Sequence, residues 1–371
     1  MTVRFATFNT SLNRPTSGAL IADLSTGKNA QAHAVAEIIQ RTRPDVLVLQ
    51  EFDHDKSGRA VSLFKRDYLE VNHGEARAIT YDHVWIPTVN TGLPSGHDLS
   101  GDGRIDGPAD AHGYGAHHGQ YGFVILSKFP IQHDDIRTFQ TFLWRDMPRA
   151  KLPSRPGPGQ QPFYSKKALE ILRLSSKNHV DVPIDIQGQT IHLLVAHPTP
   201  PVFDGPENRN GRRNFDEIRL FSDYITPNKN AYLVDDRARR GGLASSAPFI
   251  LMGDFNADPL DGDSVDGAIQ QLLDHPRVNQ LVSNGALIPR SLGGAENQAR
   301  KGDKGRADYD TAGWGLRVDY VLPSANTTPV ASGIFWPTKH DPLAALVADI
   351  NKKPASSDHR LVWVELEMTK R

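Results

Sequence analysis

Polar side chains that could do chemistry stand at the ends of apolar segments throughout this sequence. Asn9 ends an apolar segment that begins at Val3, and Glu51 directly follows another. Later segments bring further polar residues in the same way, and the full set is Asn9, Glu51, His197, Asp254, Asn256, Asp319, Asp358 and His359. A packed sheet fixes the ends of its strands, so residues placed there can form one precise site.

These residue types are the components of metal-assisted phosphate ester hydrolysis. Oxygen donors on Asn9, Glu51, Asp254, Asn256 and Asp358 suit hard cations such as Mg²⁺, Mn²⁺ or Ca²⁺. The imidazoles of His197 and His359 can donate protons to an anionic oxygen, and a carboxylate such as Asp319 can fix an imidazole tautomer. A single Asp or Asn at a strand end is usually a turn or cap residue. The recurrence of the pattern favours a site.

The surrounding pattern predicts many strands and few long helices. Apolar runs predict strands over residues 3–9, 45–50, 83–88, 122–127, 180–186, 190–197, 248–252, 316–322 and 361–366. Gln187-Gly188 predicts a hairpin turn, and Pro183 suggests that its strand lies at a sheet edge. Helical periodicity covers only residues 29–41 and 207–225.

Helices this few cannot cover a parallel sheet on both faces. The pattern therefore favours an α/β fold in which two mixed β-sheets pack face to face with helices outside. Strand-like segments recur on both sides of each long loop, at residues 90–120, 145–161, 235–247 and 291–314. We therefore expect a single domain over residues 1–371 with long loop insertions.

Composition excludes several function classes. The chain has 371 residues and no cysteine, which excludes disulfides, thiolate metal sites and thiol nucleophiles. Its formal net charge is −1, so there is no overall attraction toward nucleic acid or anionic lipid. No apolar run is long enough for a transmembrane segment. The sequence opens without a signal peptide, so the protein is either cytoplasmic or has lost a leader; the lack of cysteine favours a secreted or periplasmic protein.

Five short motifs resemble those of the endonuclease/exonuclease/phosphatase superfamily, whose members include deoxyribonuclease I-like nucleases. They are Phe8-Asn9, Leu49-Gln50-Glu51, Gly253-Asp254-Phe255-Asn256-Ala257, Val318-Asp319-Tyr320-Val321-Leu322 and Ser357-Asp358-His359-Arg360. They occur in the family's order and span nearly the whole chain. The resemblance implies a four-layer α/β sandwich, with the site at one end of the two facing sheets.

The resemblance also implies a metal and a water-activating group. Asn9, Glu51 and Asp358 would hold the principal divalent cation, Mg²⁺ or alternatively Mn²⁺ or Ca²⁺. Asp254 would align or deprotonate the attacking water. Asn256 would contact the phosphate or a second cation.

Two histidines complete the implied site. His359, polarised by Asp319, would stabilise the transition state, and His197 would bind a non-bridging oxygen or assist the leaving group. Deoxyribonuclease I-like enzymes carry a Glu that partners the first histidine, and our alignment puts Gln120 at that place. An amide could orient His197 or contact phosphate but would not raise its pKa, so the general-acid role of His197 is in doubt.

Two weaker signals lie outside these motifs. Residues 137–177 hold nine Lys or Arg but only two acidic residues, Asp146 and Glu170. This basic excess indicates either a solvated face or a rim that attracts phosphate. Arg213 is a further candidate phosphate ligand. Asp98, Ser100, Asp102 and Asp106 have the spacing of a calcium loop, with Gly103 at its sixth position. Ala109 stands where the loop needs an acidic ligand, so the alternatives are a structural Ca²⁺ and a turn without metal.

Three functions remain open at this point. The first is a divalent-metal-dependent phosphoesterase (a phosphatase or phosphodiesterase) acting on small phosphorylated metabolites or lipid head groups. The second is a sequence-nonspecific endonuclease or exonuclease, which the neutral charge disfavours. The third is a non-catalytic binding protein of the same fold, which the complete residue set disfavours. The sequence is silent on oligomeric state.

Overall fold

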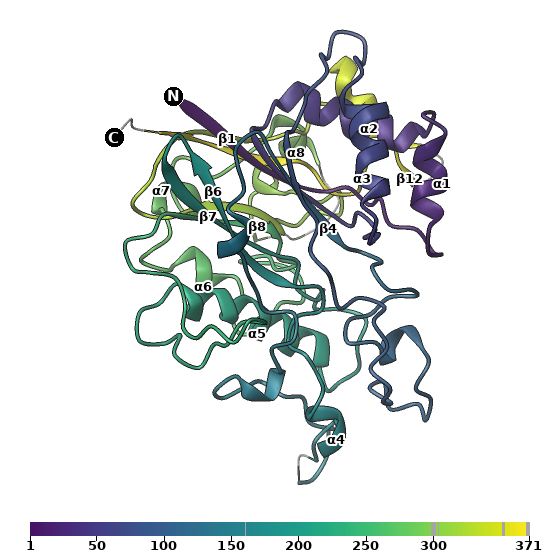
Figure 1. The fold of residues 1–371 in the computed structure, drawn as a ribbon, viewed down its shortest axis with the longest axis vertical. Coiled ribbons are helices and arrows are strands. Elements are labelled where there is room, and N and C mark those ends of the chain that lie inside the picture. Colours follow the sequence, from purple (N-terminus) through teal and green to yellow (C-terminus); the bar gives the residue numbers. More distant parts are fainter. Residues whose placement is uncertain (160, 298–301, 303, 351–352, 369–371) are drawn as a thin grey trace.

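Two mixed β-sheets form the centre of the protein, as the computed structural model of residues 1–159, 161–297, 302, 304–350 and 353–368 shows (Figure 1). The first sheet has the strand order β10-β13-β1-β2-β4-β3. Its strands are β1 (Thr2–Asn9), β2 (Val46–Gln50), β3 (His83–Trp85), β4 (Phe123–Ser127), β10 (Thr328–Ile334) and β13 (Val362–Glu367). Within it, β1 and β2 are parallel and the other pairs are antiparallel.

The second sheet has the strand order β5-β6-β7-β8-β9. Its strands are β5 (Arg137–Thr138), β6 (His179–Ile186), β7 (Gln189–Ala196), β8 (Phe249–Asp254) and β9 (Asp319–Pro323). Here β7 and β8 are parallel and the other pairs are antiparallel. The short strands β11 (Asp349–Ile350) and β12 (Lys353–Pro354) pair only with each other.

Helices cover the outer faces of both sheets, which confirms the predicted α/β sandwich. The α-helices of the described residues are α1 (Ala19–Ser25), α2 (Ala30–Thr42), α3 (Arg59–Phe64), α4 (Lys166–Leu169), α5 (Arg209–Tyr224), α6 (Gln270–Leu273), α7 (Gln280–Ser283) and α8 (Leu292–Glu296), of which α4 lies away from the sheets. Figure 1 shows α1, α2 and α3 grouped on one side and α5 and α6 on the other. None of the helices in these ranges is long and apolar enough to cross a membrane.

Alternation along the strands divides the apolar side chains between two cores. Val3 and Phe5 of β1 pack with Val182 and Leu193 of the second sheet in the core between the sheets. The residues on the other face of β1, such as Phe8, pack instead in the core beneath α1, α2 and α3. Because side chains in a strand alternate between faces, one strand can contribute to both cores.

The predicted hairpin is confirmed, and its turn has a clear local cause. Gln187 and Gly188 both have positive φ, 55° and 85°, as the tight turn between β6 and β7 requires. The prediction that Pro183 lies in an edge strand is wrong, because β6 lies between β5 and β7 and Ile131 also bridges Ile184 on the outer side. Sequence periodicity missed α1, α3 and β10, because each is short and only partly amphipathic.

Candidate active site

Strand register brings the predicted site residues together at one end of the two sheets. Asn9 pairs with Gln50 across the parallel strands β1 and β2, so Glu51 follows at the same edge. In the second sheet, Asp254 at the end of β8 lies directly opposite Asp319 at the start of β9. The parallel pairing of β7 with β8 places His197, the residue after β7, at this edge as well.

Two residues at this edge have an unusual backbone. Glu51 and Asn256 have φ of 52° and 51°, in the left-handed region that residues with a Cβ rarely adopt. Such conformations persist only where the surrounding structure fixes them, and they are typical of functional sites. At position 253 only glycine fits, because a Cβ there would lie 2.0 Å from the carbonyl oxygen of Ala196. Glycine therefore allows β8 to approach β7 closely just before Asp254.

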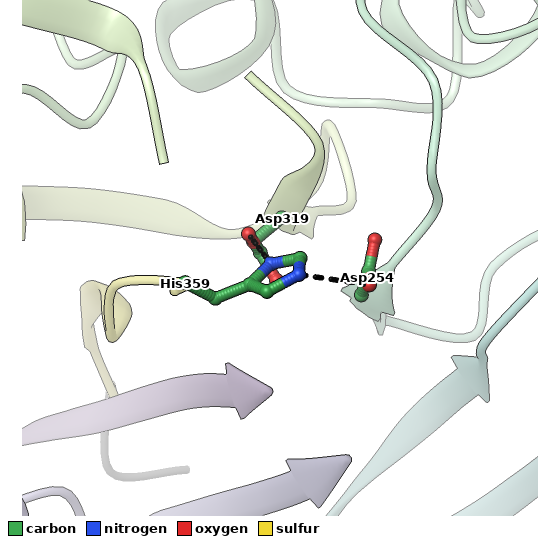
Figure 2. Close-up of side chains that lie close together, drawn as sticks. All are labelled: Asp254, Asp319 and His359. Carbon is green, nitrogen blue, oxygen red and sulfur yellow. Dashed lines mark hydrogen bonds and ion pairs between the residues drawn. The ribbon is translucent and has the colours of Figure 1, made fainter. Parts of the chain in front are cut away.

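His359 lies between two carboxylates (Figure 2). Its Nδ1 is 2.8 Å from Asp319 Oδ2, and its Nε2 is 3.7 Å from Asp254 Oδ2. Burial disfavours the imidazolium, but the charges of Asp319 and Asp254 outweigh burial and raise the pKa of His359 to about 10. The ring of Trp314, which is partly exposed, packs edge-on at 4.9 Å from the His359 ring. The site therefore holds a charged imidazole at neutral pH.

Asp319 is the partner that orients this histidine. Its Oδ2 also accepts a hydrogen bond from the Thr311 hydroxyl at 2.8 Å. Burial raises the pKa of Asp319 to about 6, against the opposing effect of His359. Thr311 in turn accepts the backbone N–H groups of Val318 and Asp319, so the hydroxyl is held in place.

Asp254 contacts three of the other predicted site residues, Asn9, His197 and His359. Its Oδ2 accepts a hydrogen bond from the Asn9 amide at 3.0 Å and lies 3.3 Å from His197 Nε2. Its Oδ1 accepts the backbone N–H of Asn256 at 2.9 Å. Burial alone would raise the pKa of Asp254, but His359, His197 and the Asn9 amide together lower it below its usual value. Asp254 is therefore a carboxylate, able to accept a hydrogen bond from a bound water.

Oxygen donors gather on the Glu51 side of the site. Glu51 Oε2 accepts the Asn13 amide at 2.7 Å, and Asp358 Oδ1 accepts the Ser11 hydroxyl at 2.8 Å. Burial, with the negative charges of Asp358 and Asp254 adding to it, raises the pKa of Glu51. A divalent cation would fit beside Glu51, because it would offset the negative charges that disfavour ionisation of this carboxylate.

The buried carboxylate–imidazole group could also hold a metal. Ligand atoms of Asp254, Asp319 and His359 all lie within 4.8 Å of one another. In this structure, however, Asp319 binds His359 Nδ1, which is the arrangement of an oriented imidazole. The Glu51 side therefore fits a hard cation better, and the ion that would bind is not identified by the donor set alone.

His197 differs from His359 in charge. Burial, together with the neighbouring Lys177 ammonium, lowers the pKa of His197 to about 4 despite its contact with Asp254. Its Nδ1 is buried and has no hydrogen-bond partner within the part of the chain that the structure describes. His197 is thus a neutral imidazole at pH 7, which agrees with the doubt about its general-acid role.

The structure does not place Gln120 as an orienting partner of His197. Its Oε1 accepts the backbone N–H of Ala116 at 2.7 Å, and its Nε2 donates to the carbonyl of Arg14 at 2.9 Å. Both ends of the amide are therefore used to hold the loop that precedes β4. The expectation that Gln120 orients His197 is wrong for this reason, and a contact of Gln120 with phosphate stays a prediction.

Arg213 is also structural. Its guanidinium donates to the carbonyls of Leu174, Arg173 and His112 at 2.6–2.9 Å. These bonds tie α5 to the segment before β6 and occupy Nε and Nη2, so that edge of the guanidinium is not available for a bidentate phosphate contact. The prediction that Arg213 binds phosphate is therefore not supported.

The predicted calcium loop is a set of backbone turns. Asp98 accepts the N–H groups of Gly101 and Gly103, and Asp102 accepts that of Arg104. The side chain of Asp106 bonds the Arg104 guanidinium, and Ser100 Oγ reaches only Asp98. Across the described ranges, these carboxylates form no group with the spacing of a metal site. These turns hold the loop in this structure, and the structural Ca²⁺ stays a prediction.

Sequence reasoning missed the importance of Lys177. It counted Lys177 only among the basic residues of 137–177, yet the side chain is buried with 6% of its surface exposed. It acts electrostatically on His197 and is influenced by Glu51 and Asp254, so it belongs to the site. Its position two residues before β6, the strand that pairs with β7, was the signal available in the sequence.

Comparison with known proteins agrees with this geometry. The sequence model of the Endonuclease/Exonuclease/phosphatase family matches residues 6–359. None of the curated proteins compared with the chain matches it in sequence.

Several solved structures resemble the chain at low sequence identity. An endonuclease/exonuclease/phosphatase from Beutenbergia cavernae superposes with a TM-score of 0.53 at 16% identity, over 99% of this chain and 72% of that chain. An AP endonuclease from Archaeoglobus fulgidus gives 0.46 at 15% identity, over 99% and 100% of the two chains. A mannosyl-6-phosphatase from Bacteroides thetaiotaomicron gives 0.48 at 12% identity, over 99% and 100%.

Proposed function

The chain belongs to the endonuclease/exonuclease/phosphatase family, whose members hydrolyse phosphoesters, and we propose that it is a divalent-metal-dependent phosphoesterase for small phosphorylated substrates, metabolites or lipid head groups. The single observation that carries this proposal is the charged His359 held between Asp319 and Asp254. A fixed cation beside a carboxylate that can orient water is the arrangement needed for in-line attack on phosphorus.

The residues divide the reaction between them. Asp254 accepts a hydrogen bond from the attacking water and aims its oxygen at phosphorus. His359 donates Nε2–H to a phosphoryl oxygen as negative charge builds there, while Asp319 keeps the ring oriented and charged. The ester P–O bond breaks, so the hydroxyl of water joins phosphorus and a proton goes to the leaving oxygen. A divalent cation bound by Asn9, Glu51 and Asp358 would supply further positive charge toward the phosphoryl group.

The distribution of basic residues favours a small substrate over a long polyanion. Arg137 pairs with Asp235 at 2.7 Å, and Lys151 pairs with Asp266 at 2.7 Å. Arg173 donates to the side chain of Asn90. Two of the nine basic charges of 137–177 are thus neutralised by these ion pairs and a third side chain is held in place, which leaves fewer of them to attract phosphates along a nucleic acid.

Hydrolysis assays with and without EDTA test the proposal. We expect Mg²⁺- or Mn²⁺-dependent cleavage of p-nitrophenyl phosphate or bis-p-nitrophenyl phosphate and little nicking of a plasmid. Asp254→Ala and His359→Ala should each lower kcat by at least about 100-fold without lowering the content of folded protein. Faster plasmid nicking than ester cleavage would favour the nuclease alternative. No cleavage of any phosphoester, with any divalent cation, would contradict the proposal.

A further inference from the structure

Lys177 presents a buried ammonium group with no partner. The residue is 6% exposed, yet its Nζ takes part in none of the hydrogen bonds and ion pairs found among the described residues. Removing an ammonium from water costs several kcal/mol unless other groups compensate. A protein that retains such a group next to its active site has a use for the charge.

The surroundings of Lys177 hold it beside the catalytic groups. Its backbone carbonyl accepts the N–H of Asn90 at 2.9 Å, and the preceding Ser176 hydroxyl donates to the carbonyl of His197 at 3.3 Å. The segment is therefore tied to both the loop after β3 and the end of β7. This anchoring limits how far the ammonium can move away from His197.

Burial lowers the pKa of the Lys177 ammonium, and nearby carboxylates oppose this shift without binding the group. Glu217 has the largest favourable effect, followed by Glu51 and Asp254. Glu217 is nevertheless occupied, because its two oxygens accept the backbone N–H groups of Ser176 at 2.7 Å and Thr199 at 2.6 Å. Asp254 is likewise occupied by Asn9 and His197. The donors of Lys177 therefore remain free for a ligand.

Lys177 lies beside His197, which is a neutral imidazole and carries no positive charge of its own. The Nδ1 of His197 has no carboxylate partner among the residues described, and Gln120 is turned toward other groups. An imidazole without such a partner is a weak source of fixed positive charge. A lysine ammonium close by can supply that charge to a bound anion, and lysine binds phosphate as a point charge without requiring a fixed fork geometry.

We propose, on the premise of the proposed function, that Lys177 is a catalytic residue that binds a non-bridging oxygen of the substrate phosphoryl group beside His197. Lys177 and His359 then contribute two separate cations to the phosphoryl oxygens. His197, as a neutral imidazole, holds Asp254 through Nε2–H. The ligand class is any phosphate mono- or diester whose phosphoryl group reaches Asp254, and inorganic phosphate as product.

Orthophosphate binding and catalysis together test this role. Lys177→Met removes the charge and keeps the length of the side chain, Lys177→Arg restores a charge, and Lys167→Met is a matched control on the exposed surface of α4. In MgCl₂ we expect Lys177→Met to lose about 100- to 1,000-fold in kcat/KM for bis-p-nitrophenyl phosphate. Its Kd for orthophosphate, measured by calorimetry, should rise at least about tenfold. Lys177→Arg should recover part of both losses, and Lys167→Met should match wild type.

The outcomes separate this inference from the function itself. If wild type is active and Lys177→Met keeps wild-type kcat/KM and phosphate affinity, the role of Lys177 is refuted and the proposed function stands. If wild type cleaves no phosphoester yet binds orthophosphate through Lys177, the proposed function fails and the phosphoryl site stands. If wild type does not bind orthophosphate, the role of Lys177 fails. Thermal unfolding of each variant identifies any loss that is due to misfolding, and loss of activity in a folded Lys177→Met that Lys177→Arg partly restores supports the proposal.

Discussion

The charge on His359 depends on Asp319, and Asp319→Asn is the substitution that tests this dependence. The pKa of His359 lies at about 10 against an ordinary value of 6.5. At 1.36 kcal/mol for each pKa unit, the site favours the imidazolium by about 5 kcal/mol. Asp319 makes the largest favourable contribution, and its Oδ2 is 2.8 Å from the ring. Asparagine retains an acceptor for Nδ1–H and removes the charge.

The expected result is a histidine that is neutral at pH 8 in Asp319→Asn and charged in wild type. Burial still disfavours the imidazolium in the variant, so its pKa should fall to 6.5 or below unless Asp254 alone compensates. Ring ¹⁵N chemical shifts of metal-free protein between pH 5 and 10 would measure this directly. In the presence of Mg²⁺, hydrolysis of bis-p-nitrophenyl phosphate at pH 8 should fall by about 100- to 1,000-fold. The activity of the variant relative to wild type should recover as the pH is lowered toward 6.

Thr311→Val is the matched control, because it removes a hydrogen bond to Asp319 and keeps the carboxylate. His359 should remain charged at pH 8 in this variant, with a smaller loss of activity. An Asp319→Asn protein whose His359 still titrates near 10, or whose activity at pH 8 equals that of wild type, would refute the reasoning.

Three further predictions follow from the same structure. Glu51→Gln should raise the Mg²⁺ concentration needed for half-maximal activity, because it removes a carboxylate proposed to bind the cation. It should also raise the melting temperature in EDTA, because burial and neighbouring carboxylates raise the pKa of Glu51 and so disfavour its charge. A lower melting temperature in EDTA would contradict this account of Glu51. Gly253→Ala should lower the free energy of unfolding by about 2 kcal/mol or more, measured in urea, because its Cβ would meet the carbonyl of Ala196 at 2.0 Å; unchanged stability would show that β7 and β8 are not held this closely. Burial lowers the pKa of His179 to about 4. The contribution of the neutral imidazole to stability is therefore complete above pH 6.5 and is lost as the pH falls toward 4, by up to about 3 kcal/mol. Between pH 7 and pH 5, the free energy of unfolding in urea should fall less for His179→Gln than for wild type, and an equal fall would contradict the assignment.

Much of the fold could be predicted from the sequence because its strands are strongly apolar. Residues 46–50 and 249–254 are completely buried strands, and their runs of Val, Ile, Leu and Met have few alternatives. Strand β10 was missed because Thr328–Ile334 alternates irregularly and contains a register shift between Pro329 and Ala331. Short helices such as α3 carry too few residues for periodicity to be visible.

The candidate site could be predicted wherever a strand end carried the signal, and only there. Asp254 and Asp319 stand opposite each other through strand register, which an apolar pattern can indicate. Gln120 and Arg213 were misjudged because the acceptors and donors that occupy them come from segments distant in sequence, such as Arg14 and His112. Lys177 was overlooked because burial of a lysine is a property of tertiary packing, and local composition made it look like a surface residue.

The central claim is that one cation site and one phosphoryl site meet at the ends of the two sheets. A crystal structure of the protein soaked with MnCl₂ and inorganic phosphate, with the manganese located by anomalous scattering, tests it most directly. We predict manganese bound to oxygens of Glu51 and Asp358, with phosphate between His359 and Lys177. Manganese bound elsewhere, or phosphate remote from His359 in a crystal where both are present, would contradict the account.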